Sequence, residues 1–419
     1  MTIPDGYRLV SPARDRAQDL LHVAGFAFAF TVPAKDAQFI DRIIPFDRAR
    51  AVEVTDSARG PAGSLAAVHA SFPFTTCVPG GRTVPTAGLT WVAVHQGHRR
   101  RGLLRAMMTD HFSRSLARGE VISTLYAAET PIYQRFGYGL AAPALRMELS
   151  RGAQLRDVPG SDALTVTLDS ADAERDAEVV RTVQSRMTRP GTTTTLTDEY
   201  VADLFLDLEH EREGAEELRI LTIRDGDAPV AYALFQRKES WNDAGADGKV
   251  RVRCWAALDA AASHRLWSVL VDFDLMSATQ ADKFAHDDPL VHLLKEPRGA
   301  KMGSYDNLWL RILDVKGALE GRGWSTDCDV TVAVEDSVLP DNAGTWRIRA
   351  VDGAATVDRS DDDPEVTVGI QDLGATYLGG PTLAALAAAG LVTEHRVGAV
   401  QALSRALSSD VKPVANLNF

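Results

Sequence analysis

The residues with the most evident chemistry in this sequence are three consecutive arginines, Arg99–Arg101, followed by Gly102. Guanidinium groups bind phosphates through several hydrogen bonds, and glycine lets the backbone come close to a ligand. A helix pattern begins directly after the glycine, and a helix N-terminus offers free N–H groups and about half a positive charge. This combination predicts a binding site for a pyrophosphate.

Two common phosphate-binding patterns are absent from this segment. The pattern GxxxxGK[ST], which holds nucleoside triphosphates, does not occur, and GxGxxG, which is typical of dinucleotide-binding folds, is not found at this site. Taken alone, the arginines leave a second interpretation open, in which Arg99–Arg101 are only a solvated basic cluster.

A tyrosine-containing motif, IYQRFGYG at residues 132–139, supplies a second group that could do chemistry. The phenol of Tyr133 is a proton donor with an ordinary pKa near 10. Taken alone, a buried tyrosine is more often structural. We interpret Tyr138 as a packing or hydrogen-bonding residue at the start of a strand.

The elements that must position these groups alternate between strands and helices. Residues 89–94 (LTWVAV) predict a strand that runs into the arginine loop, and residues 103–118 predict an amphipathic helix that ends at Gly119. Another helix is predicted to end at about residue 28. Further strands are predicted for residues 7–11, 51–54, 64–72 and 123–127.

The rest of the chain divides into two more units and a tail. A polar stretch after Glu148 (SRGAQLRDVPGSD) marks the first candidate boundary, and the last unit starts near Ile312. The second unit has no Arg/Gly loop; its predicted elements are strands 218–224, 229–236 and 250–258 and helix 263–273. The last unit has predicted strands 330–334, 344–350 and 365–370 and helices from residues 371, 382 and 397. The tail, residues 411–419 (VKPVANLNF), is largely apolar, so we expect it to be ordered and partly buried.

Charge and composition exclude several classes of function. The 419 residues carry a formal net charge of −12, which disfavours nucleic acid as a partner. The 3 cysteines are far apart and odd in number, as in proteins of a reducing compartment. No signal-peptide core and no run of about 18 apolar residues occurs, so we expect a cytoplasmic protein with no membrane partner. We expect no metal, because His95 and His98 share a loop with three arginines and His111 does not obviously converge with them.

The segment PTAGLTWVAVHQGHRRRGLLRAMM (residues 85–108), together with the tyrosine motif, resembles the enhanced intracellular survival (Eis) family of the GNAT N-acetyltransferases. The superfamily loop reads [RQ]xxGx[GA], and residues 99–104 match it except that Leu104 stands where Gly or Ala is usual. That departure fits this family. LWLRILDVKGALEGRG (residues 308–323) and Phe419 are similar too, so the resemblance spans most of the chain.

The resemblance implies an α+β protein with tandem GNAT-like domains, each a mixed, mostly antiparallel sheet with helices, followed by an α+β domain like sterol carrier protein. The implied ranges are 1–150 for a catalytic GNAT domain, 151–311 for a second GNAT-like domain and 312–419 for the third. A homohexamer is implied as well.

The resemblance also implies the site and its cosubstrate, acetyl-coenzyme A. Tyr133 is then the general acid, and the carboxylate of the terminal residue, Phe419, is the general base that the third domain supplies. In GNAT folds the strand before the loop splays from its neighbour, and the freed backbone groups bind the pantetheine arm. The implied cofactor contacts are Val92, Ala93, Val94, Arg100, Arg101, Gly102, Leu103, Leu104, Arg105, Ala128 and Glu129.

The implied activity is acetylation of a primary amine, of the aminoglycoside, polyamine or lysine type, by direct attack on the thioester. Since direct attack needs no enzyme nucleophile, Cys77 is expected to be a core thiol. The family often places acids where this chain has Phe28 and Asn418, so strong acetylation of aminoglycosides is not expected. Phe26 and Phe28 either line the substrate pocket or pack in the core. Two other functions stay open: a sterol-carrier-like protein that binds an apolar ligand, and a regulator that binds acetyl-coenzyme A without turnover.

Overall fold

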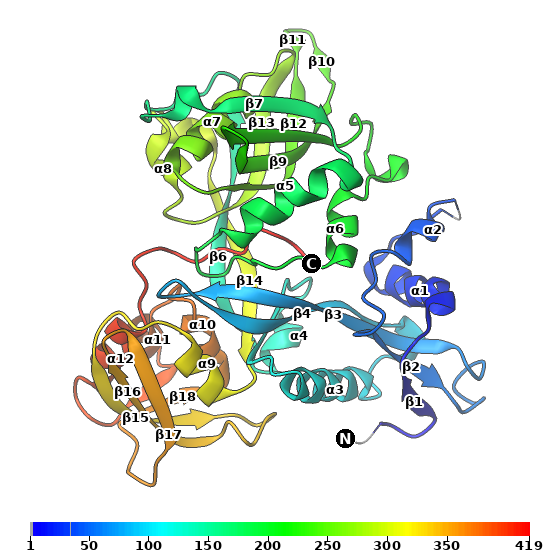
Figure 1. The fold of residues 1–419 in the computed structure, drawn as a ribbon. Coiled ribbons are helices and arrows are strands. Elements are labelled where there is room, and N and C mark those ends of the chain that lie inside the picture. Colours follow the sequence, from blue (N-terminus) through cyan, green and yellow to red (C-terminus); the bar gives the residue numbers. More distant parts are fainter. Residues whose placement is uncertain (1–2, 34) are drawn as a thin grey trace.

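The computed structural model describes residues 3–33 and 35–419, which form three parts in chain order (Figure 1). The first part contains β1 (Tyr7–Val10), α1 (Ala17–Phe28), α2 (Ala37–Ile40), β2 (Arg50–Val54), β3 (Leu65–Val78), β4 (Arg82–Val94), α3 (Leu103–Ala117), β5 (Ile122–Leu125), α4 (Thr130–Gln134) and β6 (Gly139–Ser150). The second part contains β7 (Thr165–Ser170), α5 (Ala173–Ser185), α6 (Asp198–Phe205), β8 (Arg219–Asp225), β9 (Ala228–Lys238), β10 (Trp241–Asn242), β11 (Gly245–Ala246), β12 (Gly248–Ala257), α7 (Ala260–Leu270), β13 (Met276–Phe284), α8 (Pro289–Leu293) and β14 (Gly303–Ile312). The third part contains α9 (Val315–Gly321), β15 (Cys328–Glu335), β16 (Gly344–Val351), β17 (Ala354–Arg359), β18 (Val366–Gly369), α10 (Ile370–Thr376), α11 (Leu383–Ala388), β19 (Val392–Glu394) and α12 (Ala399–Ala406).

A 12-stranded sheet runs through the first and second parts in the order β1-β2-β3-β4-β5-β14-β6-β13-β12-β9-β8-β7. β14 lies between β5 and β6, where Trp309 pairs with Leu125 and Leu310 with Gly139. The last strand of the second part therefore completes the sheet of the first. Only the pairs β4–β5 and β12–β13 are parallel in this sheet of described residues, so the predicted mixed, mostly antiparallel α+β class is confirmed.

The hairpin of β3 and β4 is longer than the sequence pattern predicted. The expected strands were 64–72 and 89–94, whereas β3 continues to Val78 and β4 begins at Arg82. Pro73 and Pro85 lie in the added stretches. Because proline cannot donate a hydrogen bond to a β-ladder, its presence favoured a loop over a strand in the sequence-based prediction. The turn between the strands uses Gly80, which has a φ of 81°.

The third part has its own 5-stranded sheet, in the order β17-β16-β15-β18-β19, around a core that includes Val332, Ile348 and Leu403. Its helix α10 packs on β6 and β14 of the large sheet. A Cβ atom at Gly139 would lie 2.0 Å from the carbonyl oxygen of Gln371, so this close approach requires glycine.

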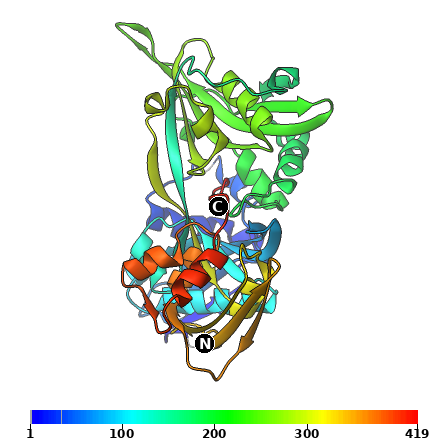
Figure 2. The ribbon, with the colours of Figure 1, turned by 90° about the vertical axis from the view of Figure 1, so that its left-hand side faces the viewer.

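The tail leaves the third part after α12 and runs back to the junction of the first and second parts, where residue 419 lies (Figures 1 and 2). Residues 413–417 are buried there. The apolar composition of the tail thus corresponds to an ordered, largely buried segment, as predicted.

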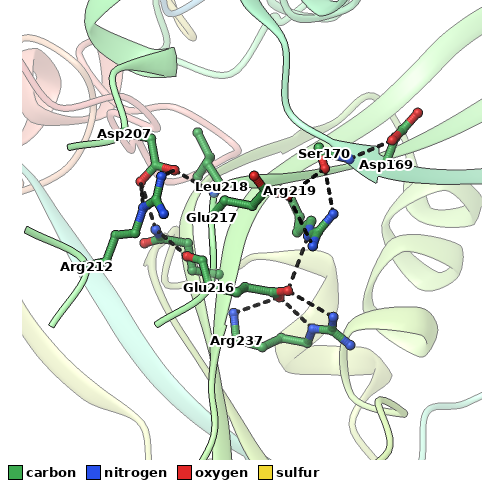
Figure 3. A network of polar contacts seen from close by, with 10 residues as sticks. Asp169, Ser170, Asp207, Arg212, Glu216, Glu217, Leu218, Arg219 and Arg237 are labelled. Atoms are coloured by element: carbon green, nitrogen blue, oxygen red, sulfur yellow. Dashed lines mark hydrogen bonds and ion pairs between the residues drawn. The ribbon is translucent and has the colours of Figure 1, made fainter. Parts of the chain in front are cut away.

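A network of polar contacts fixes the segment that follows α6 (Figure 3). The Nε of Arg237 donates to Oε1 of Glu216 at 2.6 Å, and the backbone N–H of Leu218 donates to Asp207 at 2.8 Å. Because this network holds the chain directly after α6, it helps to position Tyr200, which α6 carries toward the tail.

Candidate active site

Five of the predicted site residues meet around one cavity of about 310 Å³: Phe28, Val92, Ala128, Tyr133 and Phe419. They come from α1, β4, the segment after β5, α4 and the tail. The cavity therefore depends on the tail as well as on the first part. Its other lining residues are Ala24, Phe30, Leu89, Thr90, Trp91 and Tyr126.

Strands β4 and β5 separate at this cavity. Their ladder joins residues 86–88 to residues 122–124 and ends there. Beyond it, Trp91 has a φ of 58°, and the register of β4 on β3 shifts between Val68 and Ala70, which is the mark of a bulge. Among the described strands, the β4 backbone after Gly88 therefore has no ladder partner on its β5 side.

The predicted cofactor residues of β4 lie on this separated stretch. Ala93 and Val94 pair with Val68 and Ala67 of β3. This pairing holds β4 in place, while the other edge of β4 faces the split. Val92 is half-buried and lines the cavity. Free backbone donors and acceptors along an apolar slot fit an extended chain with amide groups, such as pantetheine.

The arginine loop leads directly into α3. Gly102 has a φ of 82° and precedes Leu103, the first helical residue, and no side chain caps this end of the helix. Arg100, Arg101 and Arg105 are exposed. Uncapped helix N–H groups beside exposed guanidinium groups form an anion site that fits a diphosphate.

The departure at Leu104 has a structural explanation. Leu103 is buried and Leu104 half-buried, and both belong to the apolar cluster that α3 forms with Val52, Val54 and Met107. The side chain of Leu104, which is larger than the usual Gly or Ala, therefore packs beneath the helix.

Tyr7 is a site residue that the sequence analysis missed. Arg101 Nη1 donates to the Tyr7 hydroxyl at 3.0 Å, and that hydroxyl lies 3.0 Å from Nδ1 of His98. Burial lowers the pKa of His98, and the charges of His95, Arg101 and Arg59 lower it further. The Tyr7 hydroxyl accepts from Arg101 and donates a hydrogen bond to Nδ1 of a neutral His98, so the pair orients Arg101. No local signal joins Tyr7 to the loop, because the two are far apart in the sequence.

Tyr133 lies on α4 with 8% of its surface exposed. Burial raises the pKa of its hydroxyl to about 12, and the negative charge of Glu129 contributes to the rise. The hydroxyl is therefore a protonated donor at neutral pH, and a weaker acid than an ordinary phenol. Ala128 and Glu129, between β5 and α4, are both exposed.

Tyr138 has a different environment from Tyr133. Its hydroxyl lies 2.7 Å from Ser123 Oγ, which lies 2.8 Å from Nε2 of His111. Tyr138 is fully buried, and burial raises the pKa of its hydroxyl. Tyr138 is thus engaged in a buried hydrogen-bonded chain beside the site, and its ring contacts that of Tyr133 with centroids 6.0 Å apart.

The end of the tail is fixed by residues from the first and second parts. The ring of Phe419 packs edge-on against Phe74 and Tyr126, with centroids 4.9 Å and 5.4 Å apart. The hydroxyl of Tyr200 donates to the carbonyl oxygen of Asn418. Phe419 is therefore held in one place on the cavity wall.

Two amide side chains hold the tail further back. Asn307 accepts from the N–H of Ala415 at 2.8 Å and donates to its carbonyl oxygen at 3.2 Å. Asn416 donates to Gln184 at 2.8 Å. None of these anchors was identified from the sequence.

Phe26 and Phe28, the two phenylalanines considered for the substrate pocket, separate in space. Phe28 lines the cavity, whereas Phe26 packs at a tilt against His22 and His95, with centroids 4.9 Å and 4.6 Å away, beside a different pocket. Both rings are about half exposed, at 48% and 52%. No aspartate or glutamate is among the residues that line the cavity.

Within residues 3–33 and 35–419, no group of three or more His, Cys, Asp or Glu side chains could hold a metal ion. No helix of the described chain is long and apolar enough to span a membrane.

Families of known domains match all three parts. Two matches are described as an acetyltransferase (GNAT) domain, at residues 10–141 and 199–312, and one as a sterol carrier protein domain, at residues 315–416. The match at residues 199–312 shows that this segment is a GNAT domain although it lacks the arginine loop.

The chain is also similar to N-acetyltransferases over most of its length. It is 36% identical over 371 residues to an uncharacterized N-acetyltransferase of Streptomyces avermitilis, covering 88% of each chain. It is 31% identical over 417 residues to the N-acetyltransferase Eis of Mycobacterium tuberculosis, covering 96% of this chain and 97% of that one. The crystal structure of Eis1 from Mycobacterium abscessus matches with a TM-score of 0.83 and 28% identity, over 99% of this chain and 100% of that one.

Proposed function

Because the chain belongs to the Eis family of GNAT N-acetyltransferases, we propose that it acetylates a primary amine with acetyl-coenzyme A in the cavity between Tyr133 and Phe419. The observation that carries the proposal is the convergence of Val92, Ala128, Tyr133 and Phe419 on one cavity beside the β4–β5 split. Acetyl-coenzyme A supplies the activated acetyl group as a thioester.

The chain holds the cosubstrate at two places. The N–H groups at the start of α3, with Arg100, Arg101 and Arg105, bind the diphosphate. The β4 backbone at Val92, Ala93 and Val94, which has no ladder partner on its β5 side, binds the amide groups of the pantetheine arm. Ala128 and Glu129 flank the same split from the β5 side.

The proton transfers then fall to Tyr133 and Phe419. The amine nitrogen bonds to the acetyl carbon while the bond from that carbon to sulfur breaks. The carboxylate of Phe419 attracts the ammonium form of the amine and takes its proton, directly or through a water, although an α-carboxylate is a weak base. The Tyr133 hydroxyl donates a proton to the departing sulfur, and its high pKa keeps that proton available at neutral pH.

The cavity lining favours amines with an apolar body. Phe28, Phe30, Trp91 and Tyr126 surround the space together with Phe419, and we assign the anionic group to the Phe419 carboxylate. A polycation leaves its further charges without partners there, at a desolvation cost. We therefore propose aralkyl and alkyl monoamines as better substrates than polyamines or aminoglycosides.

The test is a thiol-release assay with acetyl-coenzyme A and phenethylamine, spermine and kanamycin, with products identified by mass spectrometry. We expect turnover of phenethylamine that disappears in Tyr133→Ala and drops when two residues are added after Phe419. Tight coenzyme A binding with no turnover on any amine would instead identify a regulator.

The homohexamer implied by the family is a separate proposal. Light scattering after size-exclusion chromatography tests it, and a monomer or dimer of the 45.3 kDa chain contradicts it.

A further inference from the structure

A second cavity, of about 220 Å³, lies in the second part against the tail. It is lined by residues of the segment after α5, the end of β12, the start of α7 and α8, and by Val411, Val414 and Asn416 of the tail. It shares no lining residue with the cavity at Tyr133. It is therefore a separate space, and tail residues line both cavities.

This cavity lies at a second strand split. The parallel ladder of β12 and β13 ends at the pair Arg251–Gln280, and α7 follows β12 as α3 follows β4. The helix start differs, because the carboxylate of Asp259 accepts from the N–H of Ala262 at 2.8 Å and occupies the place where an anion could bind. A diphosphate therefore does not fit here.

Most charged groups around the cavity already have partners. Lys283 is buried, and its ammonium donates to Asp282 at 2.6 Å and to the carbonyl oxygen of Arg253 at 3.3 Å. Arg189 donates to Asp287 at 2.5 Å. These pairs leave no free buried cation to hold an anionic ligand.

Asp288 is the buried exception; Arg186, which also lines the cavity, has no ion pair among the described residues either, but it is exposed to solvent. Asp288 is 6% exposed, and its Oδ1 accepts from the N–H of Leu290 at 2.9 Å. Its Oδ2 has no hydrogen bond, and the carboxylate no ion pair, to any residue that the structure describes. A buried carboxylate with no cation in direct contact is costly, so this group favours a positively charged ligand.

An independent observation points to the same space. Ser263 lines the cavity, is 3% exposed, and its Oγ has no hydrogen-bond partner among the described residues. Buried hydroxyl groups are normally bonded. Met187, Leu258 and Val414 add apolar side chains to a wall that is otherwise partly polar.

From this arrangement we propose that the cavity binds a small alkylammonium ion, with its ammonium group at the Asp288 carboxylate and the Ser263 hydroxyl and its alkyl chain against Met187, Leu258 and Val414. Val414 belongs to the tail, so the bound ion contacts the segment that carries Phe419. The site needs neither acetyl-coenzyme A nor turnover.

The test uses the full chain with 13C-methyl-labelled methionine, titrated with n-butylamine hydrochloride at pH 7.5 in the absence of acetyl-coenzyme A. Met187 reports on this cavity, and its resonance is assigned with Met187→Leu. We expect a saturable shift of that resonance. n-Butanol and sodium butyrate, which have a similar alkyl chain but no positive charge, should not produce this shift.

Two variants then locate the ammonium group. Asp288→Asn keeps an oxygen to cap α8 but removes the charge, and should weaken binding by about tenfold or more. Ser263→Ala should weaken it by a smaller factor, and Asp372→Asn, which alters a half-buried carboxyl group of the third part, should leave it unchanged. A Met187 resonance that does not move, that moves equally with butanol, or that titrates normally in Asp288→Asn overturns the proposal. Because no acetyl transfer is measured, these outcomes do not depend on whether the protein is an active acetyltransferase.

Discussion

The hydroxyl of Tyr126 donates a hydrogen bond of 2.8 Å to the carbonyl oxygen of Leu417. Tyr126 follows β5 directly and lines the candidate active site, while Leu417 belongs to the tail. This contact ties the split sheet of the first part to the chain end that completes the cavity. The same hydroxyl also lies 3.1 Å from the carbonyl oxygen of Ala415.

Replacing Tyr126 with phenylalanine removes both contacts and leaves the ring. A hydrogen bond of this kind contributes about 1 kcal/mol, and a looser tail places the Phe419 carboxylate less well. We expect kcat to fall roughly tenfold, with a small change in the KM for acetyl-coenzyme A, in steady-state assays. Tyr377→Phe, which removes a buried hydroxyl bonded to Ala318 in the third part, should lower stability but not kcat; equal losses in both variants would contradict the role of Tyr126.

Tyr133→Phe tests the proton donor itself. Loss of a general acid lowers kcat by about 10²- to 10⁴-fold, while the KM for acetyl-coenzyme A should stay nearly constant. The matched variant Tyr138→Phe removes the other hydroxyl of the motif, which is bonded to Ser123. It should reduce the free energy of unfolding by about 1 kcal/mol and keep most of the activity.

The pKa of Tyr133 predicts the alkaline side of the pH–rate profile. Because burial raises that pKa to about 12, the donor proton is present below this value and is lost only as the pH rises through it. The rate with an alkylamine should rise as the amine loses its proton and should not fall before about pH 10.5. A decline in kcat centred near the ordinary tyrosine pKa of about 10 would contradict the raised pKa of Tyr133.

The arginines before α3 should act on cofactor binding rather than on chemistry. Arg100→Ala and Arg101→Ala are each expected to raise the KM for acetyl-coenzyme A by about three- to thirtyfold, with kcat nearly unchanged, and the effect should shrink at high salt. Arg118→Ala is the control, because Arg118 lies at the opposite end of the same helix. A fall in kcat alone would disagree with a binding role.

Asp288 predicts a pH-dependent stability. Burial is the main cause that raises the pKa of its carboxyl to about 6, and the charge of Asp287 raises it further. The N–H of Leu290 and the charges of Arg189 and His292 act in the opposite direction. A raised carboxyl pKa means that folding is penalised progressively as the pH rises from the ordinary carboxyl pKa of about 3.9 to about 6, and that the penalty is complete above this range. Asp288→Asn should therefore raise the free energy of unfolding by about 1–3 kcal/mol at pH 7.5 and by much less at pH 4.5, as measured by urea denaturation. A gain of equal size at both pH values would contradict this assignment.

The sequence indicated the parts of the site that local pattern encodes. The strand, the arginines, Gly102 and the helix are consecutive, and Tyr133 lies in a short motif, so both could be recognised without a structure. The contacts of Tyr7, Asn307 and Tyr200 could not, because each joins segments far apart in the chain and none has a spacing of its own. For the same reason the pKa of Tyr133 was expected near 10, since burial is a property of the fold.

The place of β14 between β5 and β6 has a consequence for biosynthesis. While the ribosome is still adding the second part, β5 and β6 have already emerged, yet the strand that separates them does not exist. Both strands then present open edges, which are prone to wrong pairing. The first acetyltransferase domain cannot finish folding as an independent unit during translation, and its completion is delayed until residue 312 is available.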